Sequence, residues 1–171
     1  RQFPDTKVNG DLDVTEGILS KTGLVSTNDL PVSDNTASFT AENNRFYRIS
    51  GAGATITLPT PEIGNTIKFL VTANLTADVD ITSPTLLALG SHLSVQGGDP
   101  GVGLIGAGLA GVVADGTTDV TLRLDGATAG GGVGTNVECY GVRQGTNTRW
   151  LIKALSALTT NLAADVSNFQ A

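Results

Sequence analysis

The sequence predicts an all-β protein with an antiparallel β-sandwich, jelly-roll-like domain. Thr, Val and Ile are frequent, and these residue types favour strands. Glycine accounts for 22 of 171 residues, which is roughly twice its usual share and supplies many turns. About eight short segments alternate apolar and polar residues, with turn signals between them. This spacing is typical of a sandwich or jelly roll rather than of a helical protein.

Residues 1–36 are expected to form an extended N-terminal arm and linker. Within 7–27, Val8, Leu12 and Val14 alternate with polar residues, and glycines interrupt the pattern. Such strand fragments are too short to bury a face alone, so they need a partner surface on their own domain or on another chain. Residues 29–38 combine Pro, Asp, Asn and Ser, as linkers do.

Residues 37–153 are expected to form the sandwich domain. Alternating segments predict its strands, and glycine-rich stretches predict two loops, at 97–111 and 126–134. The expected strands are 45–49, 54–58, 66–72, 77–82, 93–95 and 119–124, followed by a hairpin formed by 136–142 and 148–153.

Residues 154–171 form a C-terminal tail with a different pattern. Its apolar residues are spaced by 3, 4, 4 and 3 positions, which is the stripe of an amphipathic helix. They are Leu155, Leu158, Leu162, Val166 and Phe169. A helix and an extended arm are both open, and so are packing on the chain's own sandwich and docking on a neighbour.

Composition and charge argue against several function classes. Ten basic and sixteen acidic residues give a net charge of −6, so we expect no nucleic-acid binding. One Cys and one His make a zinc site improbable, and we expect no metal and no cofactor. The longest weakly polar run, 102–114, is shorter than the roughly 20 residues of a membrane span, so no membrane partner is expected.

Two motifs that could indicate chemistry have simpler interpretations. Residues 101–106 match G-x-G-x-x-G, but a turn precedes them and further glycines follow, whereas a dinucleotide site needs a strand and a helix there. Ser91 and His92 are neighbours, and neighbours on a strand point to opposite faces, so they do not form a catalytic pair. Cys139 has no basic neighbour and is interpreted as a small core residue.

Two pairs of carboxylates have a spacing that could bind calcium or cleave a glycoside. These are Asp11 with Asp13, and Asp78 with Asp80. Glu16 stands where a calcium loop that starts at Asp11 requires glycine. A solvated strand face explains both pairs better, and no catalytic residue is assigned.

Two stretches resemble a known family. Residues 46–70 include Ile56-Thr57-Leu58-Pro59 followed by Gly64, and this run is similar to the opening of capsid decoration (cement) proteins of tailed phages. Residues 145–152, Gly-Thr-Asn-Thr-Arg-Trp-Leu-Ile, resemble the closing hairpin of the same domains, with Gln144 where Asp is usual. Residues 10–14, Gly-Asp-Leu-Asp-Val, are similar to segments of trimeric phage fibres.

This resemblance implies a virion structural protein that is not an enzyme. It would sit on the outer surface of the capsid as a homotrimer and join neighbouring major capsid proteins, which stabilises the expanded head. The residues expected to contact the shell or another subunit are Phe3, Leu12, Val14, Ile18, Leu24, Leu158, Leu162, Val166 and Phe169. A tail-fibre, collar or host-glycan-binding module remains the alternative, although the loops 97–111 and 126–134 contain no aromatic residue for stacking on a sugar.

Overall fold

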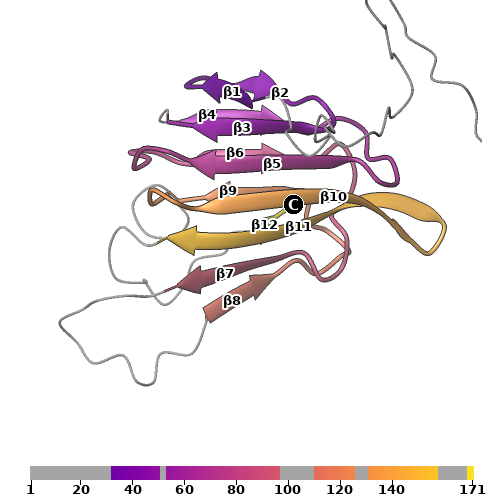
Figure 1. Ribbon diagram of the computed structural model, residues 1–171. Coiled ribbons are helices and arrows are strands. Elements are labelled where there is room, and N and C mark those ends of the chain that lie inside the picture. The colour runs from indigo at the N-terminus through magenta and orange to yellow at the C-terminus, as the bar shows by residue number, and fades with distance from the viewer. Residues whose placement is uncertain (1–31, 51–52, 97–109, 126–130, 158–168) are drawn as a thin grey trace, which may run out of the picture.

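The computed structural model describes residues 32–50, 53–96, 110–125, 131–157 and 169–171, and every regular element among them is a β-strand. The strands form two sheets that face one another across a shared core (Figure 1). The all-β prediction is therefore confirmed for this part of the chain. None of its elements is a helix long and apolar enough to cross a membrane.

The two sheets differ in size. In spatial order, the seven-stranded sheet consists of β1 (Val32–Asn35), β3 (Arg45–Ile49), β5 (Thr66–Val71), β10 (Asn136–Gln144), β11 (Asn147–Ala157), β7 (His92–Gln96) and β8 (Ala110–Val113). The five-stranded sheet consists of β12 (Phe169–Gln170), β9 (Thr121–Leu124), β6 (Val79–Thr82), β4 (Ala54–Thr57) and β2 (Phe39–Thr40).

Both sheets are mixed, which corrects the expectation of an antiparallel sandwich. Strands β1 to β6 alternate between the two sheets, and within each sheet these strands run parallel. A chain that crosses to the opposite sheet and then returns has completed a full turn, so it re-enters the first sheet in the same direction. The N-terminal half therefore winds as a coil, whereas the expected hairpin of β10 and β11 is antiparallel as predicted.

Two strands lie where the sequence predicts loops. β1 falls within the expected linker 29–38, and β8 begins at the end of the expected loop 97–111. β1 pairs with β3, and the Asp34 carboxylate accepts two hydrogen bonds from Arg48, with Oδ1–Nε at 2.5 Å and Oδ2–Nη2 at 2.6 Å. Pairing with a neighbouring strand thus outweighs a local composition that favours turns.

The helical alternative for the C-terminal tail is wrong at both of its described ends. Leu155 belongs to β11, which continues to Ala157 rather than ending at residue 153. Phe169 belongs to β12, lies opposite Leu122 and is only 5 % exposed, so it contributes to the chain's own core. Leu158, Leu162 and Val166 lie outside the described residues.

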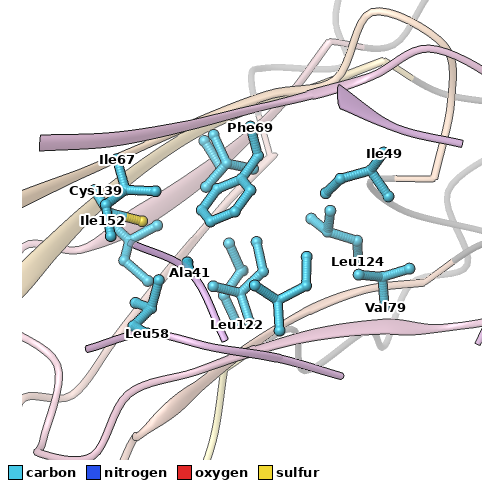
Figure 2. Packing of buried hydrophobic residues seen from close by; sticks show 14 of the residues in the cluster. Ala41, Ile49, Leu58, Ile67, Phe69, Val79, Leu122, Leu124, Cys139 and Ile152 are labelled. Atoms are coloured by element: carbon cyan, nitrogen blue, oxygen red, sulfur yellow. The ribbon is translucent and has the colours of Figure 1, made fainter. Parts of the chain in front are cut away.

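The core is built from alternate residues of both sheets. In Figure 2, Phe69 and Ile49 from the larger sheet face Leu122, Leu124 and Val79 from the smaller one, and Ile67 lies beside Cys139 and Ile152. The largest fully buried side chains are Trp150, Phe69, Ile49, Ile56, Leu58, Ile67, Ile81, Leu87, Leu93, Leu122, Leu124 and Ile152. Burial of each contributes roughly 1.5–3 kcal/mol. The inner faces of the two sheets thus form the core, and their outer faces are the surfaces that a partner could contact.

Candidate docking faces

The outer face of the seven-stranded sheet mixes apolar and charged side chains. Alternation points every second residue of a strand away from the core. Several of these outward residues are apolar, and Leu155 and Val113 are exposed by 46 % and 58 %. We call this surface the mixed face. It includes Phe46 and Arg48 on β3, Lys68 and Leu70 on β5, Glu138 and Tyr140 on β10, Arg149, Leu151, Lys153 and Leu155 on β11, His92 on β7 and Val113 on β8.

Strand register aligns the charged residues of the mixed face in one row. Lys68 on β5 lies opposite Glu138 on β10, and Glu138 lies opposite Lys153 on β11. The row continues to His92 on β7. Lys68 Nζ lies 2.9 Å from Glu138 Oε1, in an ion pair whose side chains are 39 % and 27 % exposed. The row therefore places charges of opposite sign side by side, which stabilises neighbouring strands.

Tyr140 is held in place by this row. Its hydroxyl donates a hydrogen bond to Glu138 Oε2 at 2.5 Å, and Lys153 Nζ lies 5.8 Å from the centroid of its ring. The same hydrogen bond lowers the pKa of Glu138, with a further contribution from Lys68, and raises the pKa of Tyr140 to about 12. At neutral pH the face thus presents an oriented, neutral tyrosine beside an ionised carboxylate.

The mixed face is less acidic than the chain as a whole. Arg48 and Lys68 pair with Asp34 and Glu138, and Lys153 is the third basic side chain. Arg149 points outward on β11 as well, so four basic groups and two carboxylates, with Asp34 at the rim, give this face a net charge of +2, against −6 for the whole chain. An acidic protein surface would therefore approach the sandwich most favourably on this side.

The outer face of the five-stranded sheet has a different composition. Its outward residues are Thr40, Thr55, Thr57, Asp80, Thr82, Thr121, Arg123 and Gln170, and we call this surface the threonine face. Register aligns Thr40, Thr57, Thr82 and Thr121 across four strands, and the hydroxyls of Thr82 and Thr121 are 3.2 Å apart. No apolar side chain belongs to this face.

The contrast between the two faces indicates which of them is better suited to docking. Protein interfaces are enriched in aromatic residues and Arg, and the core of an interface is more apolar than the rest of the surface. The mixed face combines Tyr140, Phe46 and Arg48 with the exposed Leu155. A surface of threonine and charged residues is typical of one that faces water. The mixed face is therefore the better candidate for docking, and the sequence analysis missed it because its residues come from six strands.

The two stretches that carry the family resemblance meet in the structure. The indole Nε1 of Trp150 donates a hydrogen bond to the Pro59 carbonyl at 2.8 Å. The main chain of Gly141 accepts a hydrogen bond from Gly64 at 3.0 Å and donates one to Asn65 at 2.9 Å. The Pro-rich loop after β4 is thus fixed against the hairpin of β10 and β11, and this contact shapes the fold rather than a binding site.

The structure gives most of the candidate catalytic and metal-binding residues a role in the fold. Ser91 is fully buried and accepts a hydrogen bond from the Ile152 amide, whereas His92 lies on the mixed face. Cys139 is buried in the core, as predicted, and burial raises the pKa of its thiol. Asp80 accepts two hydrogen bonds from Arg123, with Asp78 3.6 Å from the same guanidinium.

No metal site is evident within the described residues, where no group of three or more His, Cys, Asp and Glu side chains could hold an ion. The G-x-G-x-x-G match at 101–106 and the Asp11–Asp13 pair lie outside that part of the chain. So do the expected interface residues of the arm, namely Phe3, Leu12, Val14, Ile18 and Leu24. Their assignment stays a prediction.

A tight loop between β8 and β9 is a further feature that the sequence analysis missed. The Asp115 carboxylate accepts hydrogen bonds from the amides and hydroxyls of Thr117 and Thr118, all at 2.7–2.8 Å. These bonds hold the pKa of Asp115 well below its usual range. Arg149 Nη1 donates to the Gly116 carbonyl at 2.7 Å, which ties the loop to β11. The sequence Asp-Gly-Thr-Thr-Asp is a turn signal that could have identified it.

Comparison with known proteins adds no relative. No family model, no curated protein and no solved structure matches the chain.

Proposed function

We propose that this chain is an outer capsid decoration (cement) protein of a tailed phage, which assembles as a trimer and joins neighbouring major capsid proteins. The observation that carries the proposal is the mixed face, an outer sheet surface with exposed Leu155 and Val113, an oriented Tyr140 and a net positive charge. The resemblance of residues 46–70 and 145–152 to decoration proteins supports it independently. The proposed site of action is the outer surface of the virion.

A decoration subunit stabilises a shell by geometry and not by chemistry. Three linked subunits engage three attachment points, and after the first contact the second and third form within one complex. Separation of the shell at that joint then requires the loss of several contacts together. A sandwich with one binding face and one polar face suits this task, because it can bind the shell and remain wetted on its outer side.

We orient the sandwich with the mixed face toward the major capsid protein and the threonine face toward solvent. The occupant of the mixed face is a protein surface that offers apolar contacts to Leu155 and acidic groups near Lys153. The net positive charge of this face favours such an acidic surface over the same face of a second copy, which carries charge of the same sign. The residues that precede β1, from 1 to 31, act in the proposal as an arm that reaches a neighbouring subunit, since Val32–Asn35 pair within the chain's own sheet.

The test is binding of purified protein to heads that lack it, measured by co-sedimentation. Leu155→Asp places a charge on an exposed apolar position of the mixed face and is expected to weaken binding by about tenfold or more, since loss of one important interface contact costs roughly 1–3 kcal/mol. Thr57→Asp is the matched control, because Thr57 is exposed on the threonine face. Both variants change a solvent-exposed side chain, and urea denaturation verifies that each is folded.

Equal loss of binding in the two variants would contradict the orientation of the sandwich. No binding of the unmodified chain to heads would contradict the decoration role itself. Low copy number on purified particles, with the chain found on tails, would support a tail-fibre, collar or receptor-binding module instead.

A further inference from the structure

Among the described residues, β8 is an edge strand that lacks the usual protection against pairing. In spatial order the sheets end at four strands, β1 and β8 in the larger sheet and β2 and β12 in the smaller one (Figure 1). Proteins usually protect such edges with charges or by keeping the strand very short. β2 and β12 each have two residues, and β1 carries Asp34 in its ion pair with Arg48. β8 has the sequence Ala-Gly-Val-Val, with four residues, no charge and no proline.

Both faces of the β8 edge are apolar. Val113 points to the mixed face and is 58 % exposed. Val112 points the other way and packs only partly against the core. An added strand would cover both residues, and in a chain of net charge −6 this uncharged edge is where two copies meet with little repulsion.

Two β8 strands can pair in an antiparallel register that keeps opposed residues on the same face of the sheet. Residues opposite one another on neighbouring strands must point to the same face of the sheet. A two-fold axis at Val112 places Val112 opposite its own counterpart. The same axis places Val113 of one copy opposite Gly111 of the other, on the mixed face. The exposed valine thus covers a glycine, and the contact is self-complementary, as a two-fold interface requires.

We propose that β8 pairs with β8 of a second copy about a two-fold axis at Val112, which joins two seven-stranded sheets into one continuous sheet. A two-fold contact does not occur within a closed ring of three subunits, so in a trimeric protein it links one trimer to the next. The ladder is short, and one such contact is weak by itself. It gains strength when many copies are held side by side. The pairing does not depend on the decoration role.

The test is disulfide cross-linking of the full chain. Across an antiparallel pair the Cα atoms of directly opposed residues are about 4.5 or 5.5 Å apart, and both distances allow a disulfide. Val112→Cys is therefore expected to give a covalent dimer under mild oxidation. Val113→Cys is the matched control, because in this register its Cα lies roughly 8 Å from its counterpart, beyond the reach of a disulfide. The native Cys139 is fully buried and adds no background.

Sedimentation of the edge variant Val113→Lys, which adds no cysteine, provides a second measurement. A lysine on each paired strand is expected to shift the concentration-dependent association of the chain toward smaller species. More cross-linked dimer from Val112→Cys than from Val113→Cys, together with that shift, supports the pairing. Equal cross-linking of the two cysteine variants, or association that Val113→Lys leaves unchanged, would overturn it.

Discussion

Gly141→Ala tests the contact between β10 and the loop that follows β4. A Cβ atom at position 141 would lie 1.8 Å from the Glu62 carbonyl oxygen and 2.8 Å from its carbonyl carbon. Both are main-chain atoms, so no side-chain rotation relieves the clash. The loop must move away by more than 1 Å to restore an ordinary contact of about 3.5 Å.

The cost follows from what that movement breaks. Gly141 exchanges two main-chain hydrogen bonds with the loop, at 2.9 and 3.0 Å, and each contributes about 0.5–1.5 kcal/mol. Overpacking of a well-packed site adds about 1–3 kcal/mol. We expect Gly141→Ala to lower the free energy of unfolding by about 2–6 kcal/mol.

Urea denaturation followed by tryptophan fluorescence measures this change, because Trp150 is the only tryptophan and is itself bonded to the loop. Thr146→Ala, in the exposed turn of the same hairpin, is the control and is expected to change stability by less than about 0.5 kcal/mol. A Gly141→Ala protein as stable as this control would refute the close contact between Gly141 and the loop.

Three further predictions concern the hydrogen bonds of single side chains. Trp150→Phe removes the donor to the Pro59 carbonyl and leaves a smaller ring in a fully buried site, so the free energy of unfolding should fall by about 2–4 kcal/mol in the same urea assay. Because folding lowers the pKa of Asp115, its stabilising effect is complete above the unfolded-state value near pH 4 and is lost as the pH falls below it. Asp115→Asn should therefore show a smaller loss of stability than the unmodified chain between pH 5 and about pH 3, and equal losses would contradict the assigned hydrogen bonds. Glu138→Gln removes the charged acceptor of the Tyr140 hydroxyl, so the pKa of Tyr140 should fall from about 12 toward 10 in a titration followed by ultraviolet absorbance. An unchanged titration would show that Glu138 is not the cause of the shift.

Much of the fold was predictable from local patterns. The strands at 45–49, 66–71 and 136–144 coincide closely with alternating segments, because one face of each is buried and the other is not. Their directions could not be predicted. Parallel pairing within each sheet follows from the path of the chain between the sheets, and local sequence patterns do not indicate that path.

The C-terminal segment shows how periodicity misleads. Leu155 and Phe169 fit a helical stripe, yet one lies on β11 and the other on β12. Alternation in β11 from Trp150 to Ser156 also fits a strand, and pairing with β10 and β7 decides between the two patterns. Such pairing involves residues distant in sequence, so it cannot be predicted from a local sequence pattern.

The candidate docking face was the least predictable feature. The sequence analysis placed the interface on the arm and the tail, because apolar residues there had no visible partner. The mixed face combines single outward residues from strands far apart in the chain, and each of them is unremarkable in its own segment. Only the register of the sheet sets Lys68, Glu138 and Lys153 in one row beside Tyr140.

Amine labelling of lysines tests the docking proposal most directly. Lys68 and Lys153 are the two lysines in the part of the chain that the structure describes, and both lie on the mixed face. Free protein and protein on intact particles are acylated under the same conditions and compared by mass spectrometry, with carboxyl labelling of Asp78, beside Arg123 and away from the mixed face, as the internal reference. Strong protection of Lys68 and Lys153 on particles, with unchanged labelling of Asp78, is the predicted result. Lysines labelled equally on particles and in free protein would contradict docking through this face.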